Sequence, residues 1–237
     1  MKKFAFIAFG LIAILSTESC NKDTCYTGNE YRVGSTRYIE PFNQIDVNLS
    51  GIVEIIKDTT PFIEFIVEGN LEQYIATPVN NKVLSISLSE CFKEHQDIII
   101  RVHYDTLNTI TTSGPGDVIS NLILEQDSLV LNVKSSGDIS LTTNIKNLYS
   151  NIQGTGIVSI NGQIEKHTIE LNNSGAVNTY QAMTQNAVVN STASGNIYVR
   201  VKNTIKGELS GSGDLFYKRN PIITVVESST GKVINDN

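Results

Sequence analysis

The chain has 237 residues, with 18 Lys and Arg against 24 Asp and Glu, a net charge of −6 and an apolar content of 40%. This length and apolar content suffice for one folded domain with its own core. The acidic balance excludes the basic face with which nucleic-acid-binding domains follow phosphates, so we expect no nucleic-acid partner. Three histidines, and three cysteines without a CxxC pair, offer few ligands, so we also expect no metal site and no cofactor.

The N-terminus has the layout of a secretory signal peptide over residues 1–19. Two lysines precede an apolar run at residues 4–15, which is too short to cross roughly 30 Å of hydrocarbon. Cys20 follows, and the segment resembles a bacterial lipoprotein signal, in which the cysteine becomes the lipidated first residue. Thr17 and Glu18 depart from that pattern, which prefers Leu and a small residue there. The alternative is ordinary signal cleavage that leaves Cys20 a plain thiol.

Lipidation of Cys20 would place the protein at the outer membrane, on its periplasmic or its surface face. Residues 20–36 then form a lipid-anchored tether, because acyl chains contribute about 0.8 kcal/mol per buried CH₂ without any membrane-spanning helix. Removal of residues 1–19 takes away two lysines and one glutamate, so the mature charge is −7. An acidic surface does not adhere to anionic lipid, and we expect membrane contact through the anchor alone.

Two cysteines remain for disulfide chemistry, Cys25 and Cys91. Export places both in an oxidising compartment. A bridge between them would close a long loop and add about 4 kcal/mol in the chain-entropy account of disulfides. The alternative is two independent thiols, with Cys25 in the tether, and both readings stay open at this point.

Residues 37–237 are predicted to form a single all-β domain. In its first part, residues 37–110, apolar and polar residues alternate in runs such as 42–49 and 83–88. Such alternation predicts strands with one buried face. Residues 70–75 are the one short candidate for a helix after the signal peptide.

The second part, residues 111–237, contains a repeat of about twenty residues. A glycine returns at intervals of 21, 19, 19, 20, 18 and 18 residues, and six of these seven glycines follow Ser or Thr. The residue two positions after each glycine is always aliphatic. The predicted glycine corners are Gly116, Gly137, Gly156, Gly175, Gly195, Gly213 and Gly231.

This period predicts a solenoid. Glycine at each corner supplies either a positive φ or a close approach of two backbones, and each repeat is expected to hold two or three short strands. Units of twenty residues cannot bury a face alone, so they must stack. A meander would show turns every 8–12 residues and a propeller blade needs about 40–45 residues. We therefore expect a right-handed parallel β-helix, with regular turns over 111–237 and longer turns over 37–110.

Several segments resemble the putative auto-transporter adhesin, head GIN domain family. The resemblance begins at residues 37–47 (RYIEPFNQIDV), continues through 66–71 (IVEGNL), and is clearest at the Ser-Gly-Asp corners 136–139 and 212–215. It covers about residues 37–218 and implies an all-β, β-helix-like fold on exported proteins, frequently lipoproteins of Bacteroidetes-like bacteria. The family brings no catalytic residues, and adhesion is assigned to it by analogy. The chain departs from the pattern where Ile157 and Ala176 replace the polar corner residue.

Asp117 and Asp138 occupy equivalent corners of successive turns, so their carboxyl groups would lie about 5 Å apart. Retaining glycosidases need a similar separation, which makes a polysaccharide-cleaving pair conceivable. The competing interpretation is that Asp after Gly belongs to the turn and repeats because the corner repeats. Asp214 stands alone several turns away. We favour the turn interpretation, since none of these aspartates has an obvious Lys, Arg or His partner.

The remaining candidate ligands do not form a recognisable site. A calcium ladder would need a period of nine and an acid at every corner, and neither is present. His95 and His103 flank a buried-looking strand but lack metal-ligand spacing with Cys91 or Asp97. His167 lies between repeats and is expected at the surface.

The sequence therefore favours a non-catalytic cell-envelope lipoprotein that acts as an adhesin-like binding or structural module. Its partner would be a glycan or a host or cell-surface protein. The alternative is a polysaccharide hydrolase or lyase on the same scaffold, which depends on Asp117 and Asp138. Assembly into a homo-oligomer through the ends or faces of the solenoid is a third function that the repeat allows.

Overall fold

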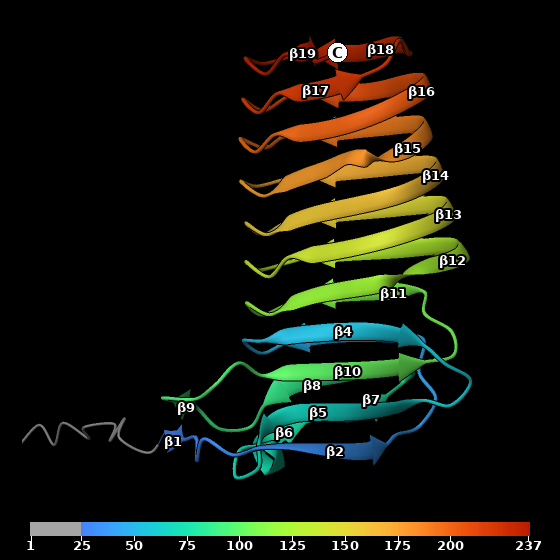
Figure 1. The fold of residues 1–237 in the computed structure, drawn as a ribbon. Helices are drawn as coiled ribbons and strands as arrows, with labels where there is room; N and C mark the ends of the chain where they lie inside the picture. Colours follow the sequence, from blue (N-terminus) through green and yellow to red (C-terminus); the bar gives the residue numbers. More distant parts are fainter. Residues whose placement is uncertain (1–24) are drawn as a thin grey trace, which may run out of the picture.

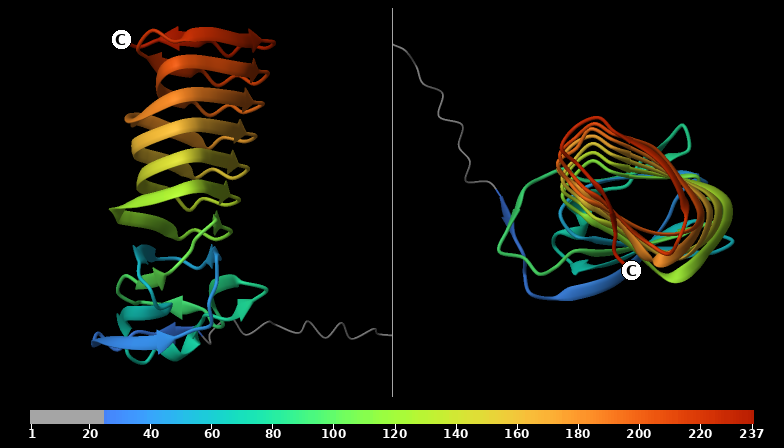
Figure 2. Two further views of the ribbon diagram at one scale, coloured as in Figure 1. Left: turned by 90° about the vertical axis from the view of Figure 1, so that its right-hand side faces the viewer. Right: turned by 90° about the horizontal axis from the view of Figure 1, so that it is seen from above.

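The computed structural model describes residues 25–237, so the predicted signal peptide, residues 1–19, and the predicted lipidation site Cys20 lie outside the described residues. The chain forms a rod of stacked coils, with β1 near its base and β19 at its top (Figure 1). Viewed along the rod, the outline of each coil falls on the next (Figure 2). Within residues 25–237, no helix has the length and apolar character needed to cross a membrane.

The coils consist of parallel strands. The long strands hold 13 to 17 residues each. The strands of the coils are β3 (Gln44–Asn48), β4 (Ile52–Lys57), β8 (Val83–Leu88), β11 (Thr109–Thr112), β12 (Asp117–Val133), β13 (Ile139–Ile152), β14 (Ile157–Leu171), β15 (Ala176–Ser191), β16 (Ile197–Leu209), β17 (Leu215–Lys218), β18 (Ile222–Glu227) and β19 (Val233–Asn235).

The predicted parallel solenoid is confirmed by the register between coils. The aliphatic residue that follows each glycine corner pairs with its equivalent in the next coil, so these residues form one column along the rod. Its members are Val118, Ile139, Val158, Val177, Ile197, Leu215 and Val233. All but Val233 are buried. In β12 to β16 a single strand continues round the bend, so the prediction of two or three short strands per turn was wrong there.

The glycine corners are required by close backbone contact and not by a positive φ, which none of the seven adopts. A Cβ atom at Gly156 would lie within 3.0 Å of the carbonyl oxygen of Gly137, and one at Gly175 would meet the carbonyl of Gly156 in the same way. Real Cβ atoms do not approach a backbone oxygen so closely. Each corner therefore packs directly on the corner below, with no room for a side chain.

The base of the rod contains antiparallel pairs as well. β2 pairs antiparallel with β5, and β5 pairs antiparallel with β10. β10 in turn pairs parallel with β4, which is a strand of the coils. Its elements are β1 (Tyr26–Thr27), β2 (Arg32–Tyr38), β5 (Phe62–Glu68), the 3₁₀ helix η1 (Glu72–Tyr74), β6 (Ile75–Ala76), β7 (Val79–Asn80), β9 (Phe92–Lys93) and β10 (Ile99–Tyr104). Residues 37–110 are thus only partly coil-like.

His167 is fully buried in the coil interior, so its predicted surface position was wrong. It lies on the inward-facing side of β14 and shares a hydrogen bond with Ser150, whose Oγ is 2.8 Å from Nε2. Nδ1 has no partner in the described residues. Burial lowers the pKa of His167 to about 3, because the interior disfavours the imidazolium ion.

We predict that Gly156→Ala destabilises the rod by about 1–3 kcal/mol, because the backbone of the neighbouring coil must move away from the new methyl group. Urea unfolding followed by circular dichroism measures the change. Gly34→Ala is the matched control: a Cβ there meets nothing within 4 Å, so its midpoint should stay close to that of the parent. Equal midpoints for the two variants would contradict the close-contact explanation.

His167 also predicts a dependence of stability on pH. Its folded pKa lies below the unfolded value of about 6.5, so between pH 6.5 and 3 the unfolded chain binds one more proton at this residue. Stability from this source is full above pH 6.5 and is lost as the pH falls, by about 2 kcal/mol at pH 5. Urea unfolding at pH 7.5 and 5 should show that loss in the parent and not in His167→Leu. If the free energies of unfolding of the parent and of His167→Leu changed equally with pH, the prediction would be wrong.

Candidate functional site

The corner aspartates form a column of hydrogen bonds to the backbone. Asp117 Oδ1 accepts from the N–H of Asp138 at 2.9 Å, and Asp138 Oδ1 accepts from the N–H of Ile157 at 2.7 Å. Asp214 accepts from Lys232 N–H at 2.8 Å in the same manner. Each carboxylate thus ties its corner to the next coil, which is a structural use of the residue type.

An amide does the same at one corner, since Asn196 Oδ1 accepts from the N–H of Asp214 at 2.9 Å. Ile157, the corner residue of the coil before Ala176, has no side-chain acceptor. The N–H of Ala176 therefore donates to the backbone carbonyl of Gly156 at 3.4 Å, a long bond. The two apolar corners, Ile157 and Ala176, therefore interrupt the column of side-chain bonds without changing the stacking of the coils.

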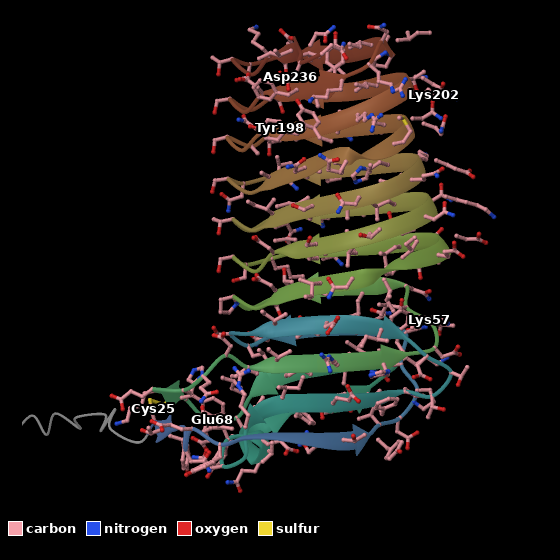
Figure 3. All side chains as sticks on the ribbon, viewed as in Figure 1. Cys25, Lys57, Glu68, Tyr198, Lys202 and Asp236 are labelled. Carbon is pink, nitrogen blue, oxygen red and sulfur yellow. A yellow bond between two sulfur atoms is a disulfide. The ribbon has the colours of Figure 1, made fainter. Side chains whose placement is uncertain are left out.

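Cys25 and Cys91 are joined by a disulfide at the base of the rod (Figure 3). Glu68, 3% exposed, lies close by and accepts from the backbone N–H of Glu30 at 2.6 Å and of Gln96 at 2.9 Å. The disulfide fastens the beginning of the described chain to β9, and the Glu68 carboxylate joins the segments on either side. The start of the folded domain is thereby held at one end of the rod.

A groove of about 630 Å³ lies where the base meets the regular coils. One wall is the connection from β10 to β11, including Tyr104, Asp105 and Leu107, and the other is the stretch 123–128 of β12. Lys57, at its rim, donates to the backbone carbonyl of Asp105 and lies 5.8 Å from the ring centre of Tyr104. Figure 3 places Lys57 on the side of the rod away from Cys25.

An irregularity of the repeat shapes this groove. The longest glycine interval, 21 residues, separates Gly116 from Gly137. The register between β12 and β13 shifts between Ser120 and Ile123, so Asn121 and Leu122 are extra residues in this coil. Leu122 and Ile123 are 58% and 61% exposed. The groove was not predicted from the sequence, although the long glycine interval was its visible signal.

A polar cluster lies on the outer face of the base. His103 Nδ1 is 3.2 Å from Asp58 Oδ2, its ring stacks on Phe62 with centroids 3.8 Å apart, and Nε2 is 3.7 Å from Glu64. Backbone N–H groups of the two residues after Asp58 lower the pKa of that carboxyl, with the His103 contact adding to the effect. Within residues 25–237, no three His, Cys, Asp or Glu side chains converge to hold a metal ion. His95 and His103 do not come together in a ligand set there.

Aromatic side chains form a short ladder near the top of the rod. Tyr198 and Phe216 occupy paired positions of adjacent coils and stack at 5.0 Å between ring centres, while Tyr180 meets Tyr198 edge-on at 5.5 Å. Lys218 Nζ lies 4.5 Å from the centre of the Tyr180 ring, whose hydroxyl donates to Asp236 at 2.8 Å. These ring faces are largely occupied by protein groups, so the ladder stiffens the coils more than it offers a platform for a ligand.

A family model described as "putative auto-transporter adhesin, head GIN domain" matches residues 41–221. No curated protein matches the chain. A crystal structure of a "putative adhesin" from Bacteroides fragilis, 20% identical, covers 89% of this chain and 100% of its own, with a TM-score of 0.81.

Two further solved structures resemble the chain at 18% identity and a TM-score of 0.69. Each covers 90% of this chain and 99% of its own. One is described as a "putative adhesin" from Parabacteroides merdae, and the other as a "putative lipid binding protein" from Parabacteroides distasonis. At these identities the likeness shows a shared fold.

The corner column predicts different outcomes for two substitutions of one residue. Asp138→Ala leaves the Ile157 N–H without its acceptor and should cost about 1 kcal/mol, whereas Asp138→Asn keeps an acceptor, as Asn196 does, and should stay near the parent. Thermal and urea midpoints measure both. A polysaccharide-cleaving activity that disappears in Asp138→Asn at unchanged stability would show that the carboxylate serves catalysis.

Proposed function

Because the chain belongs to the putative auto-transporter adhesin, head GIN domain family, we propose that it is a non-catalytic binding module of the bacterial cell envelope. In this proposal residues 1–19 direct export and Cys20 carries the lipid that anchors the protein at the outer membrane. The folded domain then presents its surface to a glycan or to a protein of the cell surface or host. Membrane contact is confined to the anchor, given the acidic mature chain.

The observation that carries this proposal is the fastening of the N-terminal end. Cys20 lies five residues before Cys25, which the disulfide to Cys91 holds at the base of the rod (Figure 3). The regular coils extend away from that end, and six intervals at about 4.8 Å each give roughly 29 Å of rod. A rod fixed at one end and continuous in its core displays its sides and its far end, as a binding module requires.

The alternative of a polysaccharide hydrolase or lyase receives less support from the geometry. Asp117 and Asp138, its only basis in the sequence, both accept hydrogen bonds from the backbone of the following coil. The groove beside β12 offers instead a concave surface with apolar and charged side chains at the side of the rod. That combination fits recognition of a partner.

Cys20→Ser tests the anchor. In a Gram-negative host grown with labelled palmitate, the parent should carry label and sediment with outer membranes, because acyl chains hold it there. The variant should lose both properties, whereas Cys25→Ser, the control that removes a different cysteine, should keep them. An unlabelled parent, or a variant that still sediments with membranes, would show that Cys20 is not the attachment point.

Adhesion itself is tested with the purified, acyl-free mature protein on glycan arrays and on extracellular-matrix and cell-wall preparations. We expect saturable binding to one class of surface, which a carbohydrate-cleaving enzyme would instead degrade. Absence of binding to all of them would contradict the adhesin-like role and favour a structural one.

A further inference from the structure

β12 is paired along only part of one edge. It pairs with β4 through Asp117–Ile119 and with β11 through Val130–Val133. Between these stretches, from Ser120 to Leu129, the described residues supply a strand partner on the β13 side alone. The widest continuous gap between the coils above is shorter, at Tyr180–Met183 of β15. Alternate residues of this part of β12 therefore direct backbone N–H and C=O groups toward an open edge.

The course of the preceding chain explains why this edge is open. After Glu54 pairs with Ile119, β4 continues along β10, where Lys57 pairs with Tyr104. The chain then reaches β11 through residues 105–108, which form a loop and not a strand (Figure 1). The position at which a strand of the preceding coil would pair with 123–128 is the groove of about 630 Å³.

The dimensions of the groove suit an extended chain. Residues 123–128 span about 20 Å at 3.3 Å per residue, which is the length of an average strand. The opposite wall is fixed, because Asn108 donates its N–H to Asn43 at 2.7 Å and accepts from Val130 N–H at 2.9 Å. A strand laid between the two walls would meet on one side a β12 edge that no strand pairs, where Gln126 Nε2 donates to the Ser128 carbonyl, and on the other side a loop held by hydrogen bonds.

The side chains around the groove indicate the chemistry of the occupant. Leu122 and Ile123 are exposed apolar residues at one end. Asp105, Glu125 and Asp127 supply three carboxylates to the lining against the single ammonium group of Lys57. Lys57 pairs with Asp105 and Lys146 pairs with Asp127, whereas Glu125 is exposed and makes no ion pair within residues 25–237. The groove thus complements apolar and basic side chains.

We propose that the open edge of β12 binds an extended peptide segment of a partner protein as an added β-strand. Backbone hydrogen bonds to the 123–128 stretch supply affinity, and apolar and basic side chains of the segment contact Ile123 and Glu125. The occupant is a partner and not the tether of this chain, since Cys25 is fixed on the other side of the rod (Figure 3). The proposal rests on the binding function above and names its partner class and site.

The test uses a phage-displayed library of random dodecapeptides selected on the purified mature protein. Enriched peptides are expected to combine apolar residues with Lys or Arg and to slow hydrogen exchange in residues 123–128. Backbone N-methylation at alternate positions of such a peptide should weaken binding at least tenfold, because an N-methyl group cannot donate to the open edge. An N-methylated peptide that binds equally well, or protection confined to another region, would overturn the proposal.

Variants locate the site by side chain. Ile123→Lys and Glu125→Lys should each weaken peptide binding at least tenfold, by removing the apolar contact and by reversing the charge. Ile157→Lys and Glu165→Lys are the matched controls, since they change exposed residues of the same types in β14, a coil paired along both edges. Their affinity should match the parent. Equal losses in both pairs, with circular dichroism unchanged, would contradict the assignment of the site.

Two other results separate the failure of this proposal from failure of the proposed function. Vesicles of phosphatidylcholine and phosphatidylglycerol that bind the acyl-free parent but not Ile123→Lys, without peptide enrichment, would identify a lipid surface as the occupant. Glycan or cell-surface binding that persists in Ile123→Lys and Glu125→Lys, again without peptide enrichment, would leave the adhesin-like role intact. Either outcome would overturn β12 as a peptide-binding edge.

Discussion

Direct contact between the backbones of successive glycine corners is the constraint on which the rest of the rod depends. A methyl group at Gly156 would overlap the carbonyl oxygen of Gly137, and the same relation repeats up the column. The strands end at each glycine corner and resume after it, as between Val133 of β12 and Ile139 of β13, so close contact at the corners keeps successive coils in register where no strand pairs them. The interior aliphatic column and the corner carboxylates can form only because the corners lie in register.

Because the coils stack regularly, a place where the stacking is interrupted can be recognised. Insertion of Asn121 and Leu122 keeps β12 in the stack but exposes Leu122 and Ile123 just beyond Ile119, where the pairing of β12 with β4 ends. A rod of fully paired coils has no free strand edges along its sides, which protects it from association. The open stretch of β12 is therefore a local exception to a rule that the other coils follow closely, and it coincides with a groove.

The polar residues of the coils divide between interior and corner, and their roles follow from that position. His167 is buried as a neutral ring beside Ser150, and its alternation with Ile169 and Leu171 was a sequence signal of that inward position. The corner aspartates had two interpretations, and the hydrogen bonds that they accept from the backbone N–H groups of Asp138 and Ile157 favour the structural one. The family to which the chain belongs is described as "putative auto-transporter adhesin, head GIN domain".

The sequence by itself determined the all-β class, a coil of about twenty residues and the parallel stacking, because a glycine that recurs with an aliphatic residue two positions later repeats one local geometry. It also indicated which residues form the core column. Only the tertiary structure decided that the corner glycines are needed for contact and not for φ, and that β12 has an open edge. Each of these depends on which coil lies against which, and that relation is absent from any single stretch of sequence. The disulfide is of the same kind, since Cys25 and Cys91 are 66 residues apart and meet through the folding of the base.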